Sequence, residues 1–337
     1  MFVLQYLKNQ IFESISMPIP SRNRHSTYPD SSTMALSEED IELVAQTTLG
    51  WPENRKWNSK DKEIRFRSCF GAPSKIVANL WNRINDNGEI ESGGRPKHLL
   101  WALIHLKVYS TIEIHCAIVG WPSRKIFSKW SWYFVEKIAE LKDSVIRLDD
   151  RFDGLNGVAN TNCFMSVDGT DCPVFEPMPF NKEMFSHKLN GPGVKYEVGV
   201  CLKTARIVWV NGPFVGSKSD GKIFRDGLGA LLCDDECVEV DKGYRGDDKM
   251  MTPEIGFTSA KRKMKSNARA QHEAVNGRLK HFSVLTTHFR HMKPSKEEML
   301  RKHKICFNAV AVITQLKFIV GGESIFEAGL VYDVNYF

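Results

Sequence analysis

The sequence has no run of about 18 apolar residues, the length at which a segment reads as a membrane-spanning helix. We therefore expect no membrane span. The apolar opening segment MFVLQYLKNQIFESI also lacks a basic leader and an obvious small-residue cleavage site, so it does not predict a secretory signal peptide.

The eight cysteines include no CxxC pair and no spacing typical of a disulfide framework. Cys233 and Cys237 have a spacing that zinc sites use, but no second Cys/His pair lies near them in the sequence. We therefore expect free thiols and a reducing compartment.

No glycine-rich phosphate loop of the Rossmann or P-loop type follows any predicted strand, which disfavours nucleotide-binding folds. The chain does contain 42% hydrophobic residues, with 8 Trp and 20 Phe. Its 337 residues can therefore bury a substantial core, either in two domains or in one large domain with a helical module.

Composition and periodicity divide the chain into four regions. Residues 1–37 are rich in Ser, Pro and Asn from about residue 16 onward, which predicts a disordered segment. A helical domain is expected over 38–155, where Ser37 is a candidate N-cap for the first helix, and an α/β domain over 156–325. Residues 326–337 are expected to form a tail.

Residues 110–141 have the outline of a helix-turn-helix. The sequence predicts one helix over 110–119, a turn at Gly120-Trp-Pro-Ser, and a longer helix from Ser123 with apolar residues every four positions. Arg124, Lys125 and Lys129 lie early on this second helix, where such motifs contact DNA. An ordinary helical hairpin fits the pattern equally well.

The α/β domain has a distinctive order of elements. Strands are predicted over 163–167, 194–202 and 206–211, followed by a helix over 222–232, a strand over 237–240, and helices over 267–282 and 297–320. A tight turn joins the second and third strands. This order predicts a mixed sheet flanked by helices, an α/β (α+β) fold.

Four acidic residues lie at positions in the predicted fold where they could bind a ligand or act in catalysis. Asp168 is expected to end the first strand, Asp220 to precede the crossover helix, and Asp241 to end the fourth strand, while Glu273 lies on the late helix. Ligands of open α/β sheets bind outside such strand ends. Mg²⁺ and Mn²⁺ prefer oxygen ligands, and a pair of these ions can neutralise the charge of a phosphodiester transfer. Asp171 is expected to be a turn residue.

Four short motifs, in order, resemble the Harbinger/PIF branch of the DDE transposases (the DDE superfamily endonucleases, related to bacterial insertion-sequence enzymes). The motifs are Val167-Asp-Gly-Thr170, Gly216-Ser-Lys-Ser-Asp220, Val240-Asp-Lys-Gly-Tyr244 and His272-Glu-Ala-Val-Asn-Gly-Arg-Leu-Lys-His-Phe282. The resemblance covers roughly residues 160–320 and is looser over the helix-turn-helix region.

This resemblance implies a ribonuclease H-like fold with Asp168 and Glu273 as ligands of two divalent cations. The middle acid stays open between Asp241, which follows the fourth strand, and Asp220. We expect Asp168, Asp241 and Glu273 to form the catalytic core, with Asp220 as a fourth ligand or a supporting group. Tyr244 and Trp209 are expected to be packing residues.

Basic residues flank Glu273. Thirteen Lys and Arg residues lie between Lys261 and Lys304, against three acids. On a helix, Arg269, Asn276 and Lys280 share the face of Glu273, and Arg278 lies beside them. These side chains are candidates for contacts to DNA phosphates, although cations in such a run also pair with acids.

The sequence thus predicts a nuclear, metal-dependent DNA endonuclease that cuts transposon ends and transfers the freed 3′-hydroxyl end to target DNA. The resemblance further implies a homodimer and a Myb-like accessory protein. Two alternatives are a domesticated relative that binds DNA or protein without cutting, and a ribonuclease H-like enzyme that acts on RNA.

Overall fold

The computed structural model describes residues 35–51, 59–86, 88, 90–153, 162–177, 179, 181–241, 243–244, 246–251, 259–290 and 295–323. The predicted disordered segment, apart from residues 35–37, and the predicted tail lie outside the described residues, as does the proposed domain boundary near 155. In the described part of the chain, no helix is both long and apolar enough to cross a membrane.

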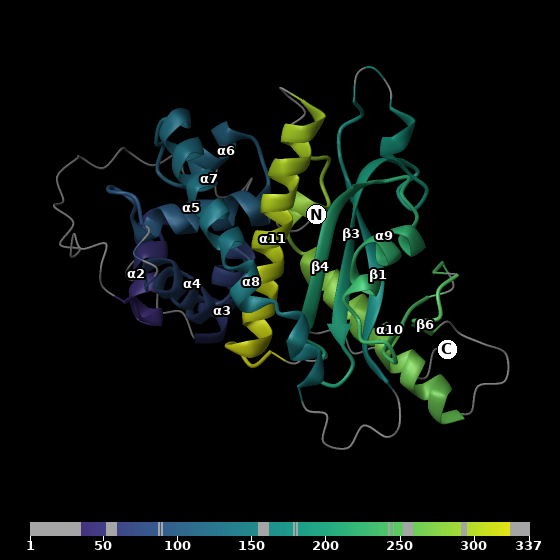
Figure 1. The fold of residues 1–337 in the computed structure, drawn as a ribbon. Coiled ribbons are helices and arrows are strands. Elements are labelled where there is room, and N and C mark those ends of the chain that lie inside the picture. Colours follow the sequence, from purple (N-terminus) through teal and green to yellow (C-terminus); the bar gives the residue numbers. More distant parts are fainter. Residues whose placement is uncertain are drawn as a thin grey trace, which may run out of the picture.

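Helices make up the N-terminal part of the chain (Figure 1). They are α2 (Glu38–Leu49), α3 (Ser59–Phe70), α4 (Ser74–Asp86), α5 (Pro96–Val108), α6 (Ile112–Ile118), α7 (Arg124–Glu140), α8 (Lys142–Val145) and the 3₁₀ turn η1 (Leu148–Phe152). The predicted N-cap of α2 is confirmed: the Ser37 hydroxyl accepts from the Asp40 amide, and the Asp40 carboxylate accepts from the Ser37 amide.

The hairpin formed by α6 and α7 matches the predicted helix boundaries. Thr111 and Ser123 accept hydrogen bonds from backbone amides at the starts of the two helices. Gly120 (φ 86°) and Trp121 (φ 59°) adopt left-handed backbone in the turn between them. A helical hairpin is therefore present, and its use as a DNA-binding helix-turn-helix stays a prediction.

Within the described residues, six strands form a mixed sheet. They are β1 (Cys163–Pro173), β2 (Phe185–Ser186), β3 (Gly191–Cys201), β4 (Ile207–Val215), β5 (Cys237–Glu239) and β6 (Met250–Met251). The order is β2-β3-β1-β5-β6, and β4 pairs with β3. The β1–β3 and β3–β4 pairs are antiparallel, whereas β1–β5 and β5–β6 are parallel. The predicted mixed α/β architecture is confirmed, and it is consistent with a ribonuclease H-like fold.

The first strand runs further than predicted. It does not end at Asp168, because Asp168 to Pro173 continue the antiparallel pairing with Val198 to Gly193 of β3. The predicted crossover helix is shorter: α9 (Asp220–Asp226) begins at the acid itself, and the 3₁₀ turn η3 (Leu228–Ala230) follows. Asp168 thus lies inside a strand rather than at its end. Asp171, expected to be a turn residue, lies in the same strand and pairs with Lys195 of β3.

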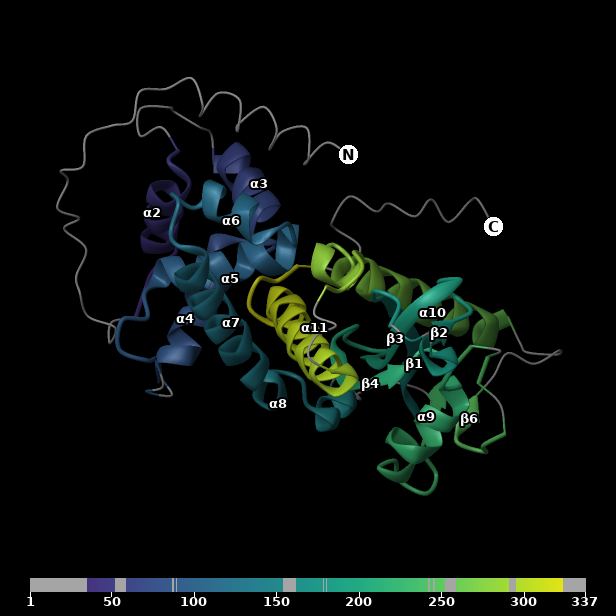
Figure 2. The same ribbon diagram turned by 90° about the horizontal axis from the view of Figure 1, so that it is seen from above.

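Alternation along the strands gives the sheet two apolar faces. Val194, Val198 and Val200 of β3 join the cluster that includes Val275 and Leu279 of α10 (Ser259–Leu279). Met165 and Val167 of β1 join a second cluster with Phe224 of α9. Figure 2 shows α10 and α9 on opposite sides of the strands.

The last helix, α11 (Lys296–Ile319), lies between the N-terminal helices and the sheet (Figures 1 and 2). One continuous hydrophobic cluster includes Trp81 of α4, Phe134 of α7, Phe307 of α11 and Val198 of β3. The helical part and the sheet therefore share a core, and this core fixes the rigid surface on which the acids stand.

Candidate active site

Asp168 lies half-buried on β1, with its carboxylate turned toward α10. Its Oδ1 accepts from the Gly169 amide at 2.8 Å, and its Oδ2 accepts from Asn276 Nδ2 at 3.4 Å. Burial raises the pKa of Asp168; the charge of Lys188 and the Gly169 amide lower it, and the charges of Asp241 and Asp220 raise it. Two further acids therefore act electrostatically on this carboxylate.

Asp220 reaches this site from the other side of the sheet. It is the first residue of α9, and its Oδ1 lies 3.0 Å from Lys195 Nζ on β3. A Cβ at position 169 would lie 2.6 Å from Asp220 Oδ1, so the missing side chain of Gly169 is what lets the carboxylate approach β1.

Asp241 is brought level with Asp168 by strand pairing. The parallel register of β1 and β5 places Ser166 opposite Glu239, and Asp241 follows two residues later. Asp241 is exposed, and its Oδ1 accepts from the Gly243 amide at 2.7 Å. Three aspartates from β1, the start of α9 and the end of β5 thus converge on one region.

Glu273 lies on α10, which runs beside β1. Ser166 Oγ is 2.9 Å from Nδ1 of His272, and Asn276, one helical turn beyond Glu273, contacts Asp168. The carboxylate of Glu273 is half exposed and accepts from Arg269 Nε at 2.9 Å. Its described partner is therefore Arg269, while the helix that carries it borders the aspartates.

The fit of this site to a divalent cation depends on donor chemistry and on space. Within the described ranges, no three His, Cys, Asp or Glu side chains are close enough together to hold a metal ion. The donors are nevertheless hard carboxylate oxygens, their charges repel one another at Asp168, and Gly169 leaves room for Asp220. These properties suit Mg²⁺ or Mn²⁺.

Two lysines at this site were missed by the sequence analysis. Lys188 Nζ donates to the carbonyl of Gly169 at 3.1 Å, and Lys195 Nζ donates to the carbonyl of Lys218 at 3.1 Å while facing Asp220. Lys195 alternates with apolar residues in β3, and that alternation was the available signal. The register with β1 is what identifies its neighbours.

Glu197 was also missed. Only 1% of it is exposed, it pairs in register with Gly169, and its Oε2 accepts from Trp209 Nε1 at 2.9 Å. Burial raises the pKa of Glu197 to about 7, with the Trp209 hydrogen bond lowering it and the charge of Asp220 raising it. Trp209, expected to be a packing residue, therefore also serves as a hydrogen-bond donor.

Tyr244 is buried in the hydrophobic cluster that includes Val167 of β1 and Phe224 of α9, as a packing residue would be. Burial raises the pKa of its hydroxyl well above the usual value, and the charges of Asp220, Glu197, Asp168 and Asp241 raise it further. The phenol therefore lies close enough to interact electrostatically with the three aspartates and Glu197.

The predicted DNA contacts on α10 divide into exposed and internal groups. Arg269 is largely exposed and Lys280 is half-buried, whereas the Asn276 side chain donates a hydrogen bond to Asp168. Arg278 is buried, lies 3.4 Å from Glu323 and stacks on the Phe318 ring. This side chain is therefore not exposed at the surface, where a contact to DNA phosphate would require it to be. The side chains of 261–263 and residue 293 lie outside the described part of the chain.

The candidate contacts on α7 are exposed. Arg124 Nε lies 3.0 Å from Glu113 of α6, and Lys129 pairs with Glu91. Lys125 is exposed beside them. Acid pairing, the alternative to phosphate contact for basic residues, is thus present at Arg124 and Lys129.

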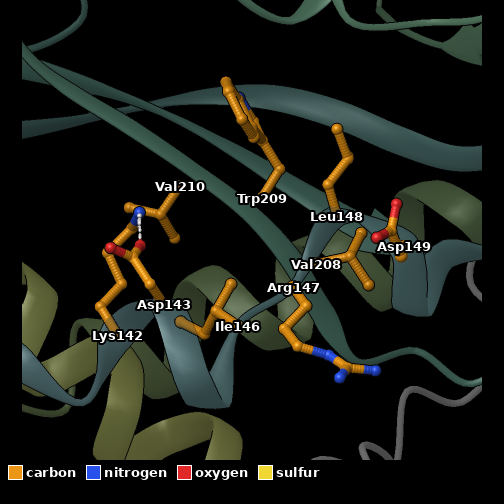
Figure 3. A pocket seen from close by; sticks show the side chains of 9 residues that line it. All are labelled: Lys142, Asp143, Ile146, Arg147, Leu148, Asp149, Val208, Trp209 and Val210. Atoms are coloured by element: carbon orange, nitrogen blue, oxygen red, sulfur yellow. Dashed lines mark hydrogen bonds and ion pairs between the residues drawn. The ribbon is translucent and has the colours of Figure 1, made fainter.

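A separate open pocket of about 360 Å³ lies where residues 142–149 meet β4. It is lined by Lys142, Asp143, Ile146, Arg147, Leu148, Asp149, Val208, Trp209 and Val210 (Figure 3). The Trp209 indole points away from Lys142 and Ile146 (Figure 3). None of the four predicted acids lines this pocket.

Residues 167–316 match the family model described as DDE superfamily endonuclease. The matched segment contains all four acids and covers less than half of the chain. It supports the superfamily that the motifs predicted, without distinguishing the Harbinger/PIF branch. No curated protein and no solved structure matches the chain.

Proposed function

We propose that this chain is a metal-dependent DNA endonuclease of the transposase type. The observation that carries the proposal is the convergence of Asp168, Asp220 and Asp241, from three separate elements, on one region of the sheet. Holding mutually repelling carboxylates close together at a partly buried site costs free energy, which a bound cation offsets. The match of residues 167–316 to DDE superfamily endonucleases supports DNA as the substrate.

Asp168, Asp220 and Asp241 would hold the divalent cation, either Mg²⁺ or Mn²⁺, and Glu273 would join them on leaving Arg269. Two such ions would neutralise charge on the phosphate and activate water or a 3′-hydroxyl. Asn276 orients the Asp168 carboxylate through its amide. Once Glu273 turns inward, Arg269 is available for a DNA phosphate, as are Lys280, Arg124, Lys125 and Lys129.

The test is a cleavage assay on DNA that carries transposon ends. Wild-type protein should cut in Mg²⁺ or Mn²⁺, and Asp168→Ala should reduce the rate by at least about 10²-fold, because it removes a carboxylate aimed at the transferring phosphate. Asp220→Ala and Asp241→Ala in the same assay identify the essential middle acid. Equal cleavage by wild type and Asp168→Ala would contradict the proposal.

A domesticated, non-cutting relative is the second candidate. One observation favours it: Glu273 is engaged with Arg269 rather than with the aspartates. Wild-type protein that binds end DNA and cuts with neither ion would support this alternative. A preference for RNA–DNA hybrid in the same assay would instead indicate a ribonuclease H-like activity.

Narrower features of the proposal come from the family resemblance. They are the Harbinger/PIF branch, a nuclear location, a homodimer and a Myb-like accessory protein. Terminal inverted repeats with short target duplications in the genomic flanks of the coding region would support a mobile element. Their absence would favour a domesticated gene.

A further inference from the structure

Besides Asp220 Oδ1, which forms an ion pair with Lys195, two buried polar atoms on the side of the sheet that α9 covers have no hydrogen-bond partner among the residues that the structure describes. They are Glu197 Oε1 and the Tyr244 hydroxyl, and each residue is 1% exposed. A buried polar atom left unpaired costs free energy, and such atoms are few in folded proteins. The presence of two such atoms near the same acidic residues therefore indicates that they have a function there.

Both groups lie on the side of the sheet that α9 covers: Tyr244 belongs to the hydrophobic cluster under α9, and Glu197 is in register with Gly169. The charge of Asp220 is the largest carboxylate contribution at Tyr244, with Glu197 next, and it also acts on Glu197. Trp209 fixes one oxygen of Glu197 through its indole N–H, which leaves Oε1 free to interact. The register of Glu197 with Gly169 puts this group on the face over which Asp220 lies.

We propose that Glu197 and Tyr244 are positioning residues for the cation site: their buried oxygens, unpaired in this structure, hydrogen-bond to the Asp220 carboxylate when it turns to hold a cation. The inference rests on the proposed function. Groups that hydrogen-bond to ligating carboxylates fix their orientation, and their loss commonly weakens metal affinity by 10- to 100-fold. Trp209 in turn orients Glu197.

The decisive variant is Tyr244→Phe, which removes one hydroxyl and keeps the ring. Mn²⁺ affinity of the full chain is measured by titration calorimetry without DNA, and the melting temperature is measured without metal. We expect about tenfold weaker Mn²⁺ binding. The melting temperature should not fall, because the deleted hydroxyl has no described partner to lose. Unchanged Mn²⁺ affinity would overturn the inference.

Tyr196→Phe is the matched control. Tyr196 is also buried, but it lies on the opposite face of β3 and its hydroxyl is 2.8 Å from His303 Nδ1. Its loss should lower the melting temperature and leave Mn²⁺ affinity unchanged. If both phenylalanine variants weaken Mn²⁺ binding equally, the effect is a general one of packing and the inference fails.

A second pair of variants keeps the test independent of Tyr244. Glu197→Gln retains an oxygen and a hydrogen-bonding group of the same shape, so Mn²⁺ affinity should stay within about twofold of wild type, whereas Glu197→Leu should weaken it about tenfold. Wild-type affinity in Glu197→Leu would overturn the positioning role. If the wild type binds Mn²⁺ and cleaves DNA while the variants bind Mn²⁺ equally well, this inference alone is contradicted. If the wild type neither binds Mn²⁺ nor cleaves DNA, the proposed function is contradicted as well.

Discussion

At the scale of single residues, the chemistry of the site is set by neighbours that are remote in sequence. Asp168 is held by its own Gly169 amide and by Asn276, 108 residues later. Its pKa is raised mainly by burial, with Asp241 and Asp220 adding to the effect. A solvated carboxylate would experience none of these influences. The ionised form of the Asp168 carboxylate therefore depends on nearby positive charge for its stability.

Glu197 gives a prediction about pH. Its pKa in the folded protein is about 7, above its ordinary value of 4.5, so the folded state keeps a proton that the unfolded state has lost. Stability from this group is full below about pH 4.5 and is lost as the pH rises toward about 7. Asp220 and Tyr244 face it, Trp209 donates to it, and Lys218 acts against the shift.

The variant Glu197→Gln removes this titration. Without metal, urea unfolding should show that the variant gains about 1–3 kcal/mol on the wild type between about pH 5 and about pH 8. The contribution of Asp168 cancels in the comparison. A constant difference across this range would show that Glu197 does not bind a proton in the folded state.

At the scale of elements, the site depends on how closely α9 approaches β1. The first residue of α9 is Asp220, and its carboxylate occupies the space where a side chain at position 169 would stand. The contact joins α9 to β1, although Asp220 lies 52 positions after Asp168 in the sequence. Any side chain at position 169 must move the helix start or the carboxylate.

Gly169→Ala is therefore expected to displace Asp220. A misplacement of this size at a reacting centre lowers the rate by on the order of 10²-fold, measured in the DNA cleavage assay. The control is Gly191→Ala on β3, where the added Cβ would meet its nearest neighbour at 3.9 Å. Equal rates for Gly169→Ala and wild type would mean that Asp220 does not need this close approach.

The elements also show what the sequence could predict. The starts of capped helices were predictable because capping is local, as at Ser37, and so was the order of the main strands and helices. The start of α10 was not: this helix begins at Ser259 and not at 267. The end of β1 was not, since Asp168 to Pro173 stay extended only because β3 pairs with them. The burial of Arg278 against Phe318 and Glu323 was not predictable, because charge alone does not reveal burial. Lys195 and Glu197 needed the strand register, which exists only in the folded sheet.

At the scale of the whole molecule, three distant segments meet where the helical part joins the α/β part. The carbonyl of Gly71, between α3 and α4, accepts from Lys317 Nζ of α11 at 3.0 Å. The Phe282 ring, just beyond α10, occupies the space that a Cβ on Gly71 would need. Gly71 also has a φ of 74°, which disfavours other residues.

Gly71→Ala should therefore destabilise the whole protein by about 2–4 kcal/mol, from backbone strain and from overpacking against Phe282. The measurement is urea unfolding. Gly50→Ala is the control, because Gly50 has a φ of 62° but no atom within 4 Å of an added Cβ. It should lose only the strain, about 1 kcal/mol. Equal losses would show that the contact with Phe282 can relax.

The position of α11 has a consequence for synthesis of the protein. This helix comes after every strand and fills the space between the N-terminal helices and the sheet. During translation, both partners leave the ribosome with their apolar faces uncovered and stay so until residues near 319 emerge. The nascent chain is open to aggregation over that interval, and chaperones that bind exposed apolar surface would act on it then. Packing of the sheet against α11 is thus delayed until this helix has left the ribosome.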